Sequence, residues 1–358
     1  HFLEHMMFKG THDISAEELN RRFDEIGARN NAYTSSEMTC FYAHVLPEKL
    51  PDALDLLGRM MRPALRDSDF QMERGVILEE IAMYKDNPFF VLYESCLDTH
   101  YAPHPMSHRV LGTTETISAL QRDQMQAYFD TRYSADNTVV SLAGKVDFDR
   151  CCEQIEKLCG SWQRTGARRD PAVPKPVGGQ IRLTDAKVNR GYWLGIADAP
   201  PMSDPRRYAS MLLAQTLGAS DNSRLHWALV ETGLAEEAQA SYDAHDGVGD
   251  YFVFASGDPD RLDEIEAIVN QQIAELAESV TQDDLDRLRN KIATGATVSG
   301  ELPNDRMQRL GRMWTYLGKY SPLEEELDKI AAVTLDDVRA IAREYPMNPV
   351  TVGRLTPA

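Results

Sequence analysis

The pattern of apolar and polar residues along the chain predicts a mixture of helices and strands. Apolar residues recur at helical spacing in 51–62, 67–85, 205–217, 260–279 and 283–293. Runs rich in β-branched and aromatic residues predict strands over 31–45, 138–145, 191–196, 238–243 and 251–256. The strands cluster instead of alternating strictly with helices. We therefore expect an α+β fold built of antiparallel-rich sheets, each with helices packed on one face.

A stretch rich in proline, glycine and charge divides the chain. Residues 164–179 show no apolar periodicity, which is typical of an interdomain linker. Each half ends on the same plan, a helix followed by a tyrosine (Tyr133 or Tyr345), an asparagine and a strand. This weak repeat indicates two homologous halves, 1–163 and 180–358.

The most informative string is His-Phe-Leu-Glu-His at residues 1–5. On a helix, His1 and His5 lie one turn apart with their rings on the same side, and Glu4 falls beside them. Two neutral imidazoles and a nearby carboxylate suit a hydrolytic zinc site, which needs metal ligands and a base for water. The spacing H-x-x-E-H is the inverzincin motif. We expect His1 and His5 to bind Zn²⁺ and Glu4 to act as the general base.

A third ligand is expected in residues 73–81, where three glutamates occur on a predicted helix. Glu73 and Glu80 are seven residues apart and share a face with Val76, Ile77 and Ile81, whereas Glu79 points away. Carboxylates aimed into apolar packing need a partner, because burying them unpaired costs several kcal/mol. We assign Glu80 as the ligand and Glu73 as the carboxylate that orients a ligand. The alternative is a pair of salt bridges to arginines such as Arg66 or Arg74.

Composition limits the range of partners. The 358 residues suit two domains, and the net charge of −18 argues against nucleic acid and anionic membranes. No apolar run approaches the length of a membrane span. Five cysteines without a C-x-x-C motif favour the cytoplasm slightly. A lost signal peptide would reverse that expectation, so the compartment stays open.

A second metal site is a weaker hypothesis. His100, His104 and His108 recur every four residues, but Pro103 and Pro105 interrupt any helix there. We expect His104 and Pro105 to lie in a loop.

Short motifs spread through both halves form a specific combination. They are HFLEHMMFKGT (1–11), NAYTS (31–35), ERGVILEE (73–80), LGT (111–113), SRL (223–225) and GLA (233–235). Together they resemble the pitrilysin family of zinc peptidases, in particular the zinc-bearing subunit of processing-peptidase-like bacterial members.

The resemblance implies a zinc endopeptidase that cleaves peptides or unfolded segments. It implies one Zn²⁺ per chain held by His1, His5 and Glu80, with Glu4 as the base and Glu73 in support. It also implies that residues 31–39 form an edge strand beside the zinc that pairs with an extended peptide substrate. Asn31 and Thr34 are the expected contacts, and a plain sheet strand is the alternative.

The chain departs from the family pattern in two places. Family members carry strand residues before the opening motif, so we expect the first half to be truncated at its N-terminus. Val230 and Glu236 stand where single-chain members carry an arginine and a tyrosine for the substrate carbonyl. Two-chain members receive these groups from a homologous subunit that lacks zinc. We therefore expect a hetero- or homodimer.

Two other functions remain open. One is a non-catalytic scaffold or core subunit of the same fold, although such subunits usually have decayed motifs and all four site residues are present here. The other is a stand-alone peptidase that uses other groups of its second half. The sequence identifies neither the biological substrate nor the cleavage preference.

Overall fold

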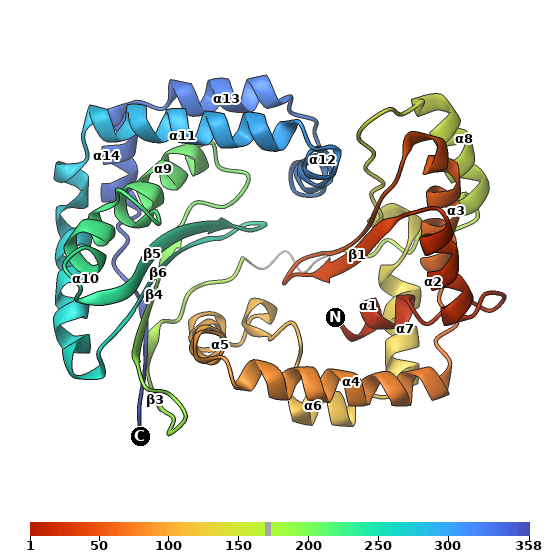
Figure 1. The fold of residues 1–358 in the computed structure, drawn as a ribbon, viewed down its shortest axis with the longest axis horizontal. Coiled ribbons are helices and arrows are strands. Elements are labelled where there is room, and N and C mark those ends of the chain that lie inside the picture. The colour runs from red at the N-terminus through yellow and green to blue at the C-terminus, as the bar shows by residue number, and fades with distance from the viewer. Residues whose placement is uncertain (169–172) are drawn as a thin grey trace. The chain divides into compact units, whose positions relative to one another are not determined.

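The structure, a computed structural model, describes residues 1–168 and 173–358 (Figure 1). Unit 1 comprises His1–Tyr84, Arg109–Pro171 and Pro303–Gly311, and unit 2 comprises Lys85–His108, Ala172–Leu302 and Arg312–Ala358. Residues 85–108 belong to the first half by sequence but pack within unit 2. Of the expected linker at 164–179, residues 169–172 lie outside the described part of the chain.

Unit 1 is mostly helical, with a single β-hairpin among its described residues. Its elements are α1 (Phe2–Met7), α2 (Ala16–Glu25), β1 (Arg29–Thr34), β2 (Thr39–His44), α3 (Leu50–Met60), α4 (Asp67–Lys85), α6 (Thr114–Ala119), α7 (Arg122–Arg132) and α8 (Phe148–Cys159). The core joins α1, α2, α3, α4 and α7 through fully buried side chains that include Met6, Phe23, Met60, Phe70 and Ile77. This core fixes α1 against α4, which are the elements that carry the predicted site.

Unit 2 is built around a five-stranded sheet of order β3-β7-β4-β6-β5. Its strands are β3 (Gly179–Thr184), β4 (Gly191–Ala199), β5 (Ala235–Ala244), β6 (Gly249–Gly257) and β7 (Thr351–Thr356). Its helices are α5 (Pro88–Tyr101), α9 (Arg207–Gly218), α10 (Leu262–Ser279), α11 (Gln282–Gly300), α13 (Leu323–Ala332) and α14 (Leu335–Glu344), and α12 (Pro303–Leu317) crosses the unit boundary. Among the described strands of this sheet, β3 and β7 are the one parallel pair. The antiparallel-rich sheet and the helices confirm the α+β class.

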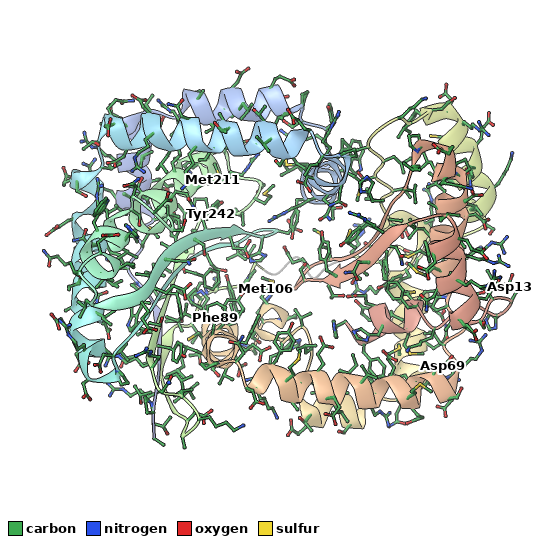
Figure 2. All side chains as sticks on the ribbon, viewed as in Figure 1. Asp13, Asp69, Phe89, Met106, Met211 and Tyr242 are labelled. Carbon is green, nitrogen blue, oxygen red and sulfur yellow. The ribbon has the colours of Figure 1, made fainter. Side chains whose placement is uncertain are left out.

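Helices lie on both faces of this sheet. Alternation along β4 sends Trp193 into the core that includes residues of α9, α10 and α14, and Leu194 into a second core with Leu92 of α5. In Figure 1, α9 and α10 lie on one side of the strands and α5 lies on the other. Phe89 of α5, labelled in Figure 2, meets the ring of Phe254 on β6 edge to face. The sequence predicts helices on one face of the sheet, but α5 covers the other face as well. Helix α5 directly follows α4 in the chain.

The strand predicted at 138–145 is wrong, although the helix before it forms. Helices α7 and α14 both end at their tyrosine, with ψ of 61° at Tyr133 and 70° at Tyr345. After Tyr345 the chain enters β7, which pairs with β3 on one side and β4 on the other. Residues 138–145 have no strand to pair with in the described part of unit 1, because β1 and β2 pair only with each other. Without a partner backbone, β propensity alone does not make a strand.

Candidate metal centre

Helix α1 presents the two histidines of the opening motif side by side. His1 caps the helix, and its carbonyl oxygen accepts the His5 backbone N–H at 3.2 Å. The apolar residues between and after them are buried, and Phe2 stacks on Phe70 of α4 with ring centroids 4.8 Å apart. The His1 and His5 rings lie next to each other, 4.6 Å between centroids. Packing of the apolar face therefore leaves both imidazoles directed towards α4.

Helix α4 brings one carboxylate oxygen to both imidazoles. Oε2 of Glu80 lies 3.7 Å from Nε2 of His1 and 3.7 Å from Nε2 of His5. Tetrahedral zinc with bonds of about 2.0–2.1 Å separates its ligand atoms by roughly 3.4 Å. Within the described residues, His1, His5 and Glu80 are the one group that could hold a metal ion. Two histidines and a glutamate are also a donor set of catalytic zinc sites. The residues present therefore fit zinc.

Helix phase explains why the Glu80 carboxylate reaches the metal position whereas the Glu73 carboxylate lies buried behind His5. Glu73 is buried with Ile77 and Ile81, whereas Val76 is 47% exposed and lies outside the packed face, contrary to expectation. The packed face is thus centred between Glu73 and Ile81, and Glu80 lies at its boundary with a partly exposed side chain. Glu79 is exposed, as its phase predicts. A ligand at such a boundary can face both the protein and incoming water.

Glu73 links the site to a lysine that sequence reasoning missed. Oε1 of Glu73 lies 2.9 Å from Nδ1 of His5, and Oε2 lies 2.5 Å from Nζ of Lys9. Burial acts to raise the pKa of the Glu73 carboxyl, but hydrogen bonds from Lys9 and His5 outweigh it and lower the pKa. An ionised Glu73 holds the proton of His5 on Nδ1, which leaves the Nε2 lone pair facing Glu80. The available sequence signal was the four-residue spacing from His5 to Lys9.

The arginines considered as alternative partners bind elsewhere. Arg66 donates to the backbone carbonyl oxygens of Lys9 and Thr11, and Arg74 donates to that of Leu120. Glu73 and Glu80 face Lys9 and the histidines instead, so the salt bridges to these arginines are not what holds the two carboxylates.

Glu4 lies beside the histidines, buried at the end of the β1–β2 hairpin. Its side chain is 8% exposed, and its Oε2 accepts a hydrogen bond from the Thr34 hydroxyl at 2.5 Å. Asn31 is exposed on the same strand, and its Oδ1 accepts the Ala32 N–H. In the described residues β1 pairs with β2 alone, so its other edge has no partner strand.

His100, His104 and the two substituted positions, Val230 and Glu236, all lie in unit 2. His100 is fully buried, with Nδ1 2.8 Å from Oγ1 of Thr351 and Nε2 3.4 Å from Asp250. His104 caps a short 3₁₀ turn after α5 ends at Tyr101. Val230 packs partly buried against the core, and Glu236 pairs with Arg190.

In the part of the chain described here, no helix has the length and apolar character to cross a membrane.

Comparison with known proteins identifies the family. Residues 1–114 match the family model "Insulinase (Peptidase family M16)", and residues 119–292 match "Peptidase M16 inactive domain". An uncharacterized zinc protease of Bacillus subtilis is 30% identical, over 100% of this chain and 88% of its own. One of Mycobacterium tuberculosis is 35% identical, over 96% of this chain and 80% of its own.

Solved structures share the fold across the whole chain. A protease from Helicobacter pylori superposes with a TM-score of 0.90 at 20% identity, covering 99% of this chain and 88% of its own. A peptidase M16 inactive domain from Pseudomonas fluorescens gives 0.86 at 18% identity, covering 100% and 88%. At these identities the likeness concerns the fold alone. The family models and the curated relatives go further, and they show that this chain belongs to peptidase family M16, the pitrilysin family.

Proposed function

We propose that this chain is the zinc-bearing subunit of an endopeptidase that cleaves peptides or unfolded segments. The observation that carries the proposal is the approach of His1, His5 and Glu80 to one point, with the buried carboxylate of Glu4 beside them. The matched family and the zinc-protease names of the relatives support it.

The side chains of the site have distinct roles in the proposed hydrolysis. His1, His5 and Glu80 hold the metal, and Glu73 with Lys9 keeps His5 in the required tautomer. Zinc bound there supplies a Lewis acid that lowers the pKa of water and polarises the scissile carbonyl. Glu4 accepts the proton of the attacking water as the new C–O bond forms. It then donates that proton to the amine as the C–N bond breaks.

An extended substrate can bind along the edge of β1 that has no partner strand in the described residues. The backbone groups there can pair with a peptide regardless of its sequence, which suits an enzyme that accepts varied substrates. The Asn31 side chain and the backbone of Thr34 are the proposed contacts. The alternative of a plain strand has no partner for this edge among the described residues.

A homologous subunit completes the proposed enzyme. Val230 and Glu236 provide neither a cation nor a phenol for the substrate carbonyl, and Glu236 is already paired with Arg190. A second M16-type chain, either a paralogue or another copy, would supply these groups. An enzyme that needs no partner would have to use other side chains of unit 2.

The competing function is a scaffold of the same fold without activity. Such a protein gains nothing from a buried carboxylate at position 4 or from the Lys9–Glu73–His5 arrangement. Burying a carboxylate with a single hydrogen bond costs free energy, so the buried Glu4 favours a working site.

The test combines metal analysis with cleavage of internally quenched peptides by the intact protein, alone and with its homologous subunit. Glu4→Gln should retain zinc and lose turnover, because it keeps the shape but removes the base. Glu79→Gln, an exposed glutamate on α4, is the matched control and should behave as the wild type. Zinc binding without any cleavage, even with the partner, would leave the scaffold as the function. Normal cleavage by Glu4→Gln would remove Glu4 as the base.

A further inference from the structure

Two threonines face each other where the β1–β2 hairpin ends beside the site. Thr34 and Thr39 are direct partners in the antiparallel register, and their hydroxyl oxygens are 3.4 Å apart. The Tyr133 phenol at the end of α7 hydrogen-bonds Thr39 from the other side. Three hydroxyl groups from three elements of unit 1 therefore form a chain that leads to Thr34.

This group of hydroxyls adjoins the proposed base, Glu4. The Thr34 hydroxyl donates its proton to Oε2 of Glu4 at 2.5 Å, so the same proton is not available to a substrate. Thr34 is the one hydrogen-bond donor to this carboxylate in the described residues, which leaves Oε1 without one. A hydrogen bond at one oxygen restrains the rotation of the carboxylate and leaves the other oxygen unbonded among the residues described.

We propose that Thr34 is a positioning residue for Glu4, and that its contact with Thr39, which is itself bonded to Tyr133, restrains the Thr34 side chain. The inference rests on the proposed peptidase function, and it assigns to the Thr34 side chain a role other than substrate contact. The hydrogen bond to Oε2 restrains the carboxylate to one orientation beside the metal position.

Two contacts compete for the Thr34 hydroxyl proton. Its oxygen lies 2.5 Å from Oε2 of Glu4 and 3.4 Å from Oγ1 of Thr39, so the hydrogen bond to Glu4 is much the stronger of the two. Burial raises the pKa of the Tyr133 phenol to about 12, and the hydrogen bond with Thr39 acts to lower it. A hydrogen bond to a carboxylate is also stronger than one between neutral hydroxyl groups.

The test compares variants that separate the hydroxyl from the shape of the side chain. Thr34→Val removes the donor at almost equal volume, and Thr34→Ser keeps it. Ser36→Ala, at an exposed position in the turn of the same hairpin, is the matched control. With the intact protein, its homologous subunit and quenched peptides, Thr34→Val should lower kcat by about 10- to 100-fold, since misplacing a catalytic group by about 1 Å can cost that much. KM and zinc content should stay within about twofold, and Thr34→Ser should recover most of kcat.

Other outcomes overturn the proposal in distinct ways. A rise in KM at constant kcat would make Thr34 a substrate contact, and unchanged kinetics would leave it without a role in the reaction. Crystal structures of wild type and Thr34→Val give a readout independent of turnover, in which the Glu4 carboxylate should leave its position. An unmoved carboxylate refutes positioning even if the wild type cleaves nothing, whereas absence of wild-type cleavage alone counts against the peptidase. If Thr34→Val does not fold, Thr39→Val tests the same chain one link away and should lower kcat less.

Discussion

Substitutions of Glu73 and Lys9 distinguish an effect on metal affinity from an effect on folding stability. Glu73→Gln keeps the shape of the side chain but removes the acceptor of His5 Nδ1 and the counter-ion of Lys9. Loss of a carboxylate that orients a metal-bound histidine typically weakens metal affinity by about 10- to 100-fold, or roughly 1.4–2.7 kcal/mol. We expect a loss of zinc affinity within that range.

The same change should also lower the free energy of unfolding. Breaking a fully buried ion pair costs about 3–5 kcal/mol. Because the Lys9 side chain keeps 28% of its surface exposed, its ammonium can regain water, and we expect a smaller cost, about 1–2 kcal/mol. The double variant Lys9→Met/Glu73→Gln replaces the pair with neutral groups of similar size, so it should recover most of this stability.

The assay measures both quantities on the intact protein. Denaturant unfolding of the metal-free form gives stability, and competition with a chelator gives zinc affinity. We predict that the double variant regains stability but not zinc affinity. If zinc affinity returns together with stability, Glu73 acts through folding alone and the proposed control of the His5 tautomer is refuted.

Two further changes test unit 2. Burial acts to raise the pKa of Glu326, but hydrogen bonds from Ser321, Tyr208 and Lys329 lower it to about 2. Its stabilising effect is therefore complete above pH 4.5 and lost as the pH falls towards 2. Thermal unfolding should show wild type losing up to about 3 kcal/mol more than Glu326→Gln over that interval, and equal losses would contradict the assignment. A Cβ at Gly353 of β7 would lie 2.3 Å from Sγ of Cys96 on α5, so Gly353→Ala should cost about 1–3 kcal/mol in chemical denaturation. Gly295→Ala, in α11 with nothing within 4 Å, is the control and should be neutral or slightly stabilising; similar effects of the two changes would argue against close packing of α5 on β7.

Local periodicity predicts the elements that depend on one segment alone. Helix α4 spans the residues expected from its pattern, and helix phase is enough to distinguish the partly exposed Glu80 from the exposed Glu79. Val76 is exposed although its phase predicts burial, because phase gives the spacing of a helix face but not which neighbours cover it.

The sequence does not reveal features that depend on residues far apart along the chain. Residues 138–145 have the composition of a strand, yet strand formation requires a neighbouring backbone that the pattern does not reveal. Helix α5 follows α4 directly, but its apolar residues pack against the sheet of unit 2. The hydrogen bond from Thr34 to Glu4 joins positions 30 residues apart, so only the folded hairpin shows it.

The most direct test of the metal centre is zinc stoichiometry in two adjacent variants of α4. The intact protein should bind one zinc ion per chain, Glu79→Gln should bind the same amount, and Glu80→Gln should lose most of it. Inductively coupled plasma mass spectrometry after dialysis against a weak chelator measures this without any assumption about substrate or partner. Full zinc retention by Glu80→Gln, or zinc loss by Glu79→Gln, would contradict a centre built from His1, His5 and Glu80.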